Sequence, residues 1–222
     1  ALGYHARATN NYSAAVGSGA QALGRYSAAL GDSSDAAAIS ATALGSHAVA
    51  QQQATAVGQA TTAVGIGSIA VGFQAQATGA YSAALGETSS ATGKKAVAIG
   101  LDSRAPGIQA FALGPYSQAT ASNSTALGGA IDRNGDGSIG AGEYTAATGG
   151  LSMALGSASQ ATQTNATAVG GESLASAAGA TALGSLAQAT ASNSVAIGFG
   201  SIANIANTVS VGTTSSFRRI VN

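Results

Sequence analysis

The chain has 222 residues, of which 7% are charged and 5% are aromatic, and its acidic and basic side chains balance to a net charge of zero. Neutrality removes the electrostatic basis for binding nucleic acid or an anionic membrane surface, and the absence of cysteine excludes disulfides and thiol chemistry. No run reaches the roughly 18–20 apolar residues of a membrane span. No secretion signal is visible and the first residues already lie inside a repeat, so we expect a fragment of a longer protein.

A repeat of 14 residues runs along the chain as far as Gly212. Each repeat contains Ala, a branched apolar residue and Gly in succession, and we call the branched residue the anchor of its coil. The steps between anchors are 14 residues, except for 13 from Leu44 to Val57 and 28 from Leu127 to Leu155. This period predicts a solenoid in which each coil contacts only its neighbours. The anchors are Leu2, Val16, Leu30, Leu44, Val57, Val71, Leu85, Ile99, Leu113, Leu127, Leu155, Val169, Leu183, Ile197 and Val211.

Small residues recur at fixed positions around each anchor. Ala precedes the anchor in every coil but the last, where it is Ser210, and Gly always follows it. Ala, Ser or Thr also recur three residues before, four after and six after the anchor. A spacing of two marks one face of a strand, so each coil is predicted to hold two short strands. Their small faces meet in an interior that accepts little more than Ala, and the fixed Gly supplies a turn.

The outward faces of the two predicted strands differ. The first strand presents an apolar wall, formed by the anchors and by the residues two before them, including Ile69, Val97, Phe111, Met153, Val195 and Val209. The second strand presents a polar wall, with Arg7, Gln21, Gln76, Arg104, Gln118, Gln160 and Gln188. Stacked coils would expose an apolar stripe larger than soluble monomers carry. We therefore expect self-association with closed cyclic symmetry, although the pattern does not set the number of subunits.

The step of 28 residues contains a surplus of one period, Ile131–Tyr144, because Ala130 is the last residue in phase and Thr145 is in phase again. The surplus contains DRNGDGSIGAGE, which fits the calcium-loop pattern D-x-[DN]-x-[DN]-G-x5-E. Side-chain oxygens, one backbone carbonyl, a water and a closing bidentate carboxylate would surround the ion. The predicted ligands are Asp132, Asn134, Asp136, Ser138 through its carbonyl, Gly140 through water, and Glu143.

We expect one Ca²⁺ per chain, which orders the loop rather than forming the adhesive feature itself. Gly137 allows the sharp turn, and the Gly-rich flanks are poor helix formers, so a lone loop is expected instead of a helix–loop–helix pair. The alternatives are a divergent coil or a turn rich in Asp and Gly. Ala141, which stands where a branched anchor should fall, argues against the coil.

The remaining patterns favour structural interpretations. A column of threonines (Thr9, Thr78, Thr92, Thr120, Thr162 and Thr190) would suit ice binding, but Leu23, Ala37, Gln51, Val64 and Pro106 interrupt it, which favours a hydroxyl ladder. His5 and His47 share a turn column, as do Tyr12, Tyr26 and Tyr81, and the tyrosines either pack on turns or supply contacts. Lys94 and Lys95 read as a solvated turn. No nucleophile, base and orienting group converge, so we predict no enzyme.

The segments NSVAIG at 193–198, NSTALG at 123–128 and NATAVG at 165–170 resemble the head repeat of YadA-like trimeric autotransporter adhesins. The residues from Val209 to Gly212, followed by Arg218, Ile220 and Asn222, resemble the start of the neck, although Phe217 and Arg219 depart from the acidic and amide residues usual there. The resemblance implies a left-handed parallel β-roll head over 1–212, the start of a neck over 213–222, a homotrimer, and a bacterial outer-surface location.

The same resemblance implies adhesion as the task. The head would attach to matrix proteins, host cells, abiotic surfaces or sister heads through many weak contacts that sum by avidity. A part outside this chain would anchor the protein in the outer membrane, and this fragment itself would not touch the membrane. The competing hypothesis is a structural spacer that displays an adhesive region located elsewhere, and ice binding is a third class.

Overall fold

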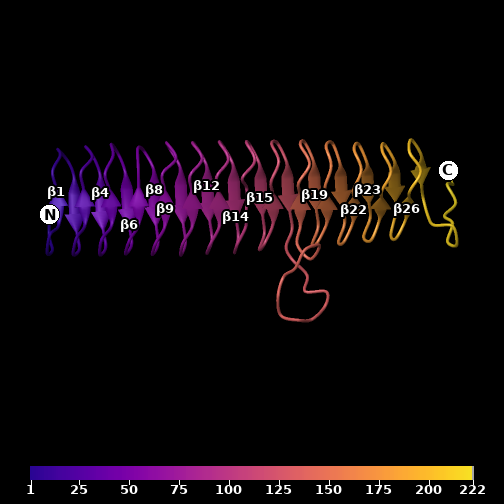
Figure 1. The fold of residues 1–222 in the computed structure, drawn as a ribbon, viewed down its shortest axis with the longest axis horizontal. Helices are drawn as coiled ribbons and strands as arrows, with labels where there is room; N and C mark the ends of the chain where they lie inside the picture. The colour runs from indigo at the N-terminus through magenta and orange to yellow at the C-terminus, as the bar shows by residue number, and fades with distance from the viewer. Residues whose placement is uncertain (222) are drawn as a thin grey trace. The chain divides into compact units, whose positions relative to one another are not determined.

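The computed structural model describes residues 1–221, and within that range the chain is a parallel β-solenoid without helices (Figure 1). Strands of three residues alternate with strands of two residues, and a turn follows each strand. The fold divides into two compact units, Ala1–Gln109 and the chain from Ala110 onward. The solenoid of about 14-residue coils expected from the repeat is thereby confirmed.

Each unit contains two parallel sheets, one from each kind of strand. In the first unit the longer strands are β2 (Ala14–Val16), β4 (Ala28–Leu30), β6 (Thr42–Leu44), β8 (Thr55–Val57), β10 (Ile69–Val71), β12 (Ala83–Leu85) and β14 (Val97–Ile99). The shorter strands are β1 (Arg7–Ala8), β3 (Gln21–Ala22), β5 (Asp35–Ala36), β7 (Val49–Ala50), β9 (Thr62–Ala63), β11 (Gln76–Ala77) and β13 (Ser90–Ala91).

The second unit repeats this arrangement. Its anchor-bearing sheet contains β15 (Phe111–Leu113), β17 (Thr125–Leu127), β19 (Met153–Leu155), β21 (Thr167–Val169), β23 (Thr181–Leu183), β25 (Val195–Ile197) and β27 (Val209–Ser210). Its other sheet contains β16 (Gln118–Ala119), β18 (Ala146–Ala147), β20 (Gln160–Ala161), β22 (Leu174–Ala175), β24 (Gln188–Ala189) and β26 (Ile202–Ala203).

The sequence period sets the register of both sheets. Ala15 pairs with Ala29 one coil later, and Ala22 pairs with Ala36. At the shortened step Leu44 still pairs with Val57, so the missing residue is taken from a turn and the side chains keep their faces. Since a slip of one residue would turn every small side chain outward, the interior enforces this register.

The interior of each coil accepts only small side chains, as predicted. The alanines before the anchors are at most 1% exposed from Ala15 to Ala196, and the largest fully buried side chains are Thr61 and Thr145. Many interior serines donate a hydrogen bond to a turn carbonyl three residues earlier, as Ser89 does to Gly86 at 2.8 Å, which offsets the cost of burying a hydroxyl. The anchors point outward, with Leu30 42% and Ile197 40% exposed.

The turns place residues with side chains in the left-handed region of backbone conformation. His47 has φ 57° on one side of its coil, and Tyr81 has φ 59° on the other, so the predicted turn columns of His and Tyr are confirmed. The Gly after each anchor meets a different demand. At Gly72, with φ 132°, a Cβ would lie 2.5 Å from the carbonyl oxygen of Gly86 in the next coil.

Leu151 offers a test of this turn strain, because it combines φ 57° with 62% exposure. A residue with a side chain pays roughly 1–2 kcal/mol in the left-handed region, and the greater freedom of glycine in the unfolded chain offsets part of that. We expect Leu151→Gly to raise the free energy of unfolding by about 0.5–1 kcal/mol, measured by chemical denaturation. Thr164→Gly, at an exposed turn position without positive φ, is the control and should lower it.

Candidate functional site

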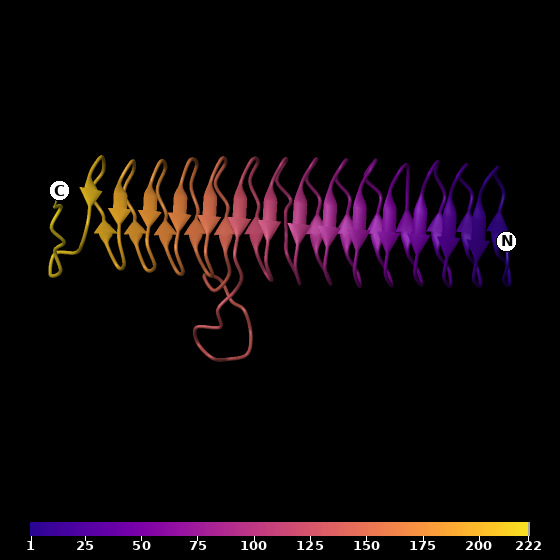
Figure 2. The ribbon, with the colours of Figure 1, turned by 180° about the vertical axis from the view of Figure 1, so that it is seen from behind.

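The segment between β17 and β18 leaves the solenoid as a loop. Residues 131–144 contain no strand and project from one turn edge in both views (Figure 1 and Figure 2). An antiparallel bridge between Ala130 and Tyr144 closes the base of the loop. The solenoid continues beneath it, since β16 pairs directly with β18 through Gln118 and Ala146. These residues therefore do not form the divergent coil that was the alternative.

Thr145 joins the base of the loop to the next coil. Its buried hydroxyl lies 2.9 Å from the carbonyl oxygen of Gly129 and 2.7 Å from that of Gly156, and its side chain is fully buried. The exit of the loop is thus tied both to its entry and to the following anchor turn.

Backbone amides hold the two exposed aspartates of the loop. The carboxylate of Asp132 accepts hydrogen bonds from the amides of Gly135 at 2.7 Å and Gly137 at 2.9 Å. Asp136 accepts from the amide of Ser138 at 2.7 Å and from the side-chain amide of Asn134 at 2.9 Å. Four of the six predicted ligands therefore lie in one tight turn, with their oxygens engaged by the turn itself.

Glu143 closes the loop from its base. It is 6% exposed, and its carboxylate accepts from the amides of Arg133 at 3.1 Å, Asn134 at 3.3 Å and Gly140 at 2.8 Å. Across residues 1–221, no group of three acidic, His or Cys side chains gathers closely enough to hold a metal ion. The structure brings the predicted ligands into one loop, but does not bring the three carboxylates to one point.

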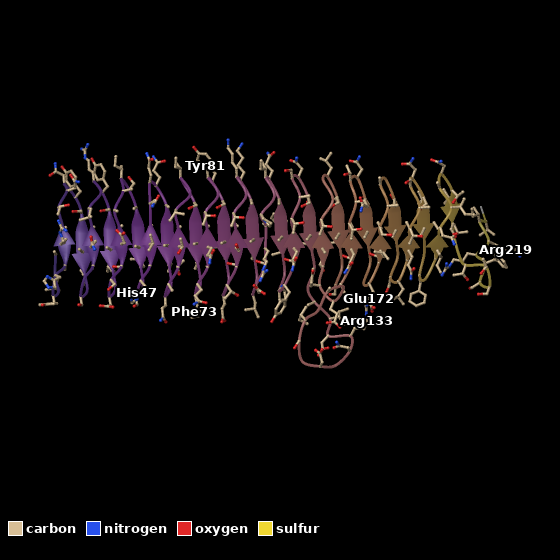
Figure 3. All side chains as sticks on the ribbon, viewed as in Figure 1. His47, Phe73, Tyr81, Arg133, Glu172 and Arg219 are labelled. Atoms are coloured by element: carbon tan, nitrogen blue, oxygen red, sulfur yellow. The ribbon has the colours of Figure 1, made fainter. Side chains whose placement is uncertain are left out.

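An ion pair fixes the loop to the polar wall of the second unit. The guanidinium of Arg133 lies 2.7 Å from the carboxylate of Glu172 (Figure 3), and a hollow between loop and wall is lined by both residues together with Gly142, Gln160 and Gln188. Sequence reasoning missed this contact because Arg133 occupies an unspecified position of the calcium pattern. Its signal was the rarity of charge in the chain.

The polar wall of the first unit carries Arg104, which forms an exposed ion pair with Asp102 at 3.2 Å. On the same wall Asp35 pairs in register with Gln21 and Val49, and its Oδ1 has no hydrogen-bond partner. Burial raises the pKa of Asp35 above its ordinary value of 3.8. The charged form is therefore disfavoured in the folded chain.

This shift predicts a pH dependence for Asp35→Asn. Because the folded-state pKa is raised, the destabilisation is absent below pH 3.8 and grows as pH rises through the folded pKa. At pH 7 we expect Asp35→Asn to raise the free energy of unfolding, by less than about 1 kcal/mol because solvent still reaches the group. Denaturation curves at pH 7 and pH 3 should show the difference at pH 7 only. An equal gain at both pH values would contradict the assignment.

The apolar wall is exposed in both units. In the first unit Ile69 is 46% and Val71 37% exposed, and in the second Met153 is 45% and Leu183 45% exposed. These side chains lie in register on neighbouring strands, so each unit presents a continuous apolar face. The opposite polarity of the two walls is as the repeat predicted.

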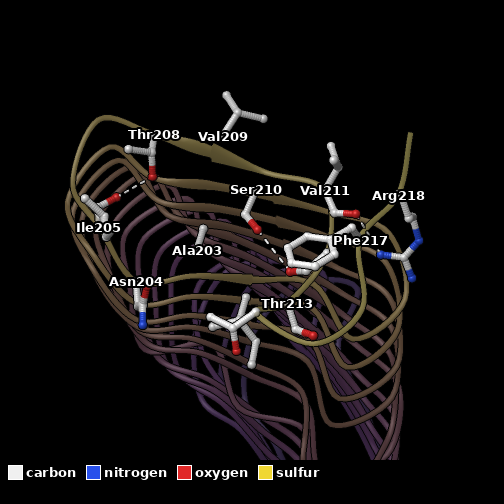
Figure 4. Close-up of a pocket in the computed structure, with 13 residues that line it drawn as sticks. Ala203, Asn204, Ile205, Thr208, Val209, Ser210, Val211, Thr213, Phe217 and Arg218 are labelled. Carbon is white, nitrogen blue, oxygen red and sulfur yellow. Dashed lines mark hydrogen bonds between the residues drawn. The ribbon is translucent and has the colours of Figure 1, made fainter. Parts of the chain in front are cut away.

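The C-terminal segment folds back on the last coils. Arg218 donates to the hydroxyl of Ser201 at 2.8 Å and to the carbonyls of Val211 at 3.0 Å and Phe199 at 2.5 Å. Beside it, Val209 and Phe217 line a hollow at the end of the sheets (Figure 4). Of the predicted neck residues, Asn222 lies outside the described residues. The contacts of Arg218 could not be read from the repeat, because the repeat ends before it.

Two comparisons with known proteins bear on this architecture. The family model of the YadA head domain repeat matches most of the chain, at residues 1–20, 22–48, 51–75, 77–103, 105–130, 147–173, 175–201 and 193–215. The chain belongs to the YadA head family. The unmatched stretch between 130 and 147 is the projecting loop, so the loop lies outside the YadA head repeat. The resemblance seen in the sequence is confirmed.

A solved structure gives the second comparison. The collagen-binding domain of the Yersinia adhesin YadA is similar with a TM-score of 0.53 and 28% sequence identity, over 65% of this chain and 73% of that chain. No match was found among curated proteins. Within residues 1–221 no helix is long and apolar enough to cross a membrane.

Proposed function

We propose that this YadA-like head is a non-enzymatic adhesin module that attaches a bacterial surface to an extracellular matrix protein. The observation that carries the proposal is the likeness to a collagen-binding head, and collagen is the first ligand to test. Repeated coils present the same polar wall and turn edges many times. Weak contacts to a long, repetitive ligand would therefore add through effective concentration.

Assembly into a homotrimer belongs to the same proposal. The exposed apolar walls of both units support it, because a closed cyclic arrangement buries an identical face of every subunit against the axis. A membrane anchor elsewhere in the parent protein would hold the assembled head at the outer surface. Multivalency would then come from several identical heads as well as from several coils.

Binding of the chain to immobilised collagen tests the adhesin proposal. The chain would be fused to a trimeric coiled coil and compared with the unfused chain under conditions in which that chain is monomeric. We expect saturable binding by the trimer that exceeds monomer binding by about 100-fold or more through avidity. Coated albumin is the control surface. A correctly assembled trimer that is inert toward collagen, other matrix proteins, cells, plastic and sister heads would favour the spacer hypothesis.

We also propose that the loop binds one Ca²⁺ per chain as a structural ion. The support is the unbroken match of Asp132 to Glu143 with the calcium pattern and the buried position of Glu143 in the same loop. Ca²⁺ takes six to eight oxygens, so the carboxylates would exchange backbone partners for the ion. Bound Ca²⁺ would neutralise the acidic loop and order it.

Calorimetric titration checks this prediction. We expect one Ca²⁺ per chain for the unaltered protein and a loss of affinity of at least about 100-fold for Asp132→Ala, because a direct carboxylate ligand is removed. Asp32→Ala, which removes an exposed acidic group outside the loop, is the control and should bind normally. Absence of binding heat in the unaltered protein, or equal affinity of Asp132→Ala, would refute calcium binding while leaving the adhesin proposal intact.

A further inference from the structure

The two turn edges of the first unit carry opposite charges. Edge A consists of the turns that precede the anchor-bearing strands, at 9–13, 23–27, 37–41, 51–54, 64–68, 78–82, 92–96 and 106–109. Edge B consists of the turns that follow these strands, at 3–6, 17–20, 31–34, 45–48, 58–61, 72–75, 86–89 and 100–103. Edge A contains three basic residues and no acidic residue, whereas edge B contains three acidic residues and neither Lys nor Arg. In Figure 3, Tyr81 marks edge A, and His47 and Phe73 mark edge B.

Contacts within the chain leave most of these charges unpaired. Arg25, Lys94 and Lys95 on edge A are exposed, and none of them forms an ion pair within residues 1–221. Arg25 instead lies over the ring of Tyr26, 4.7 Å from its centroid. On edge B, the exposed side chains of Asp32 and Glu87 also lack ion pairs, and Asp102 pairs only with Arg104 across a solvated surface.

The opposite charges also lie at the same levels along the unit. A coil of 14 residues rises by ~4.8 Å, so residues seven apart differ in level by only about 2.4 Å. Arg25 stands seven residues before Asp32, Lys94 seven after Glu87, and Lys95 seven before Asp102. Each cation of edge A thus has an acidic counterpart at its level on edge B, on the opposite side of the roll.

Exposed apolar residues follow the same matching. Ile66 on edge A is 46% exposed and lies seven residues before Phe73 on edge B, which is 43% exposed. Ile108 on edge A is 52% exposed and lies seven residues after Leu101, which is 42% exposed. Ile39 is the exception, since the residues at its level on edge B are polar. Complementarity of two surfaces at equal heights is what a contact between identical, parallel copies requires.

We propose that edge A of one chain packs against edge B of the next chain, so that Arg25 meets Asp32 and Lys94 meets Glu87 between subunits. The inference rests on the proposed homotrimer. When identical units face a common axis with their apolar walls, rotation brings the leading edge of one beside the trailing edge of its neighbour at unchanged height. An antiparallel pair would instead place edge A against edge A and oppose like charges. The charged edges therefore favour the parallel, closed ring and fix its vertical alignment.

Engineered disulfides test the geometry in the full chain, which has no cysteine of its own. Because the two positions lie on opposite edges, Arg25→Cys with Asp32→Cys cannot close within one chain. We expect mild oxidation to give a covalent trimer as the largest product on a non-reducing gel, since every chain bonds to both neighbours. Arg25→Cys with Gln59→Cys is the matched control. Its cysteines are displaced by about two coils, roughly 10 Å, and it should remain uncrosslinked.

A charge exchange tests the energetics by sedimentation. Arg25→Asp with Lys94→Glu should weaken assembly about tenfold or more, because several pairs turn from attractive to repulsive. Adding Asp32→Arg and Glu87→Lys should restore it to within about threefold of the unaltered chain. Added salt should weaken the unaltered assembly and strengthen the repulsive variant.

The outcomes separate the edge contact from the function. A trimeric unaltered chain that yields no covalent trimer, or whose assembly ignores the charge changes, would overturn the edge contact and leave adhesion untouched. A reversal of edge A that abolishes binding to heparin without changing the sedimentation coefficient would also overturn it, and would make edge A a site for an anionic polymer. An unaltered chain that stays monomeric, even on a trimeric coiled coil that still binds collagen, would remove the assembly premise alone.

Discussion

Replacement of Ala84 by leucine is expected to prevent folding or to lower the free energy of unfolding by more than about 3 kcal/mol. Ala84 is the central residue of β12, is fully buried, and pairs in register with Ala70 and Ala98. The coil interior holds nothing larger than threonine, so the added carbons can be accommodated only by separating the two sheets. Chemical denaturation followed by circular dichroism would measure the loss.

The neighbouring residue supplies the control. Ala83 points to the apolar wall and lies in register between Ile69 and Val97, so Ala83→Leu meets a column that already holds branched residues. We expect it to change the free energy of unfolding by no more than about 0.5 kcal/mol. Equal stability of Ala84→Leu and Ala83→Leu would mean that the interior is not the steric limit inferred here.

Replacement of Gly72 by alanine is expected to cost at least about 3 kcal/mol, because strain and collision act together. The backbone at Gly72 has φ 132°, and a Cβ there would approach the carbonyl oxygen of Gly86 to 2.5 Å. Both atoms of the collision are fixed to neighbouring coils, so relief requires moving one coil away from the next. The change would appear as a lower denaturation midpoint.

Gly150 is the matched control for this substitution. It lies in a turn without positive φ, and a Cβ there would meet nothing within 4 Å. Gly150→Ala should therefore be neutral or stabilise the chain by up to about 1 kcal/mol through the unfolded state. Comparable destabilisation by Gly150→Ala and Gly72→Ala would show that neither backbone conformation nor approach of the next coil sets the glycine requirement.

The repeat made most of the fold predictable. A spacing of two between small residues assigned both strands of each coil, and the burial of Ala15 and Ala22 beside the exposure of Leu30 follows from that spacing alone. Thr61 shows that the interior takes a somewhat larger side chain where its hydroxyl finds a carbonyl, here that of Gly72 at 2.7 Å. Periodicity carries this information because each coil repeats the same packing problem.

The features outside the period were predictable only in part. The calcium pattern located the loop, but a local pattern contains no information on which wall the loop approaches, so the ion pair of Arg133 with Glu172 came only from the structure. Likewise the repeat ends before Arg218, whose partners are backbone carbonyls that no residue type announces. The opposed charges of the turn edges were present in the sequence, but became meaningful once the turns were assigned to two sides.

The bridge between Ala130 and Tyr144 has a consequence for how such heads diversify. Because the chain departs and returns at adjoining points, the excursion adds no offset to the ladder beneath it, and β16 and β18 pair as if nothing intervened. The length and content of the excursion are therefore free of the constraint that governs every coil. This position is a natural grafting site, where an unrelated peptide could be exchanged for residues 131–144 while the scaffold keeps its alignment.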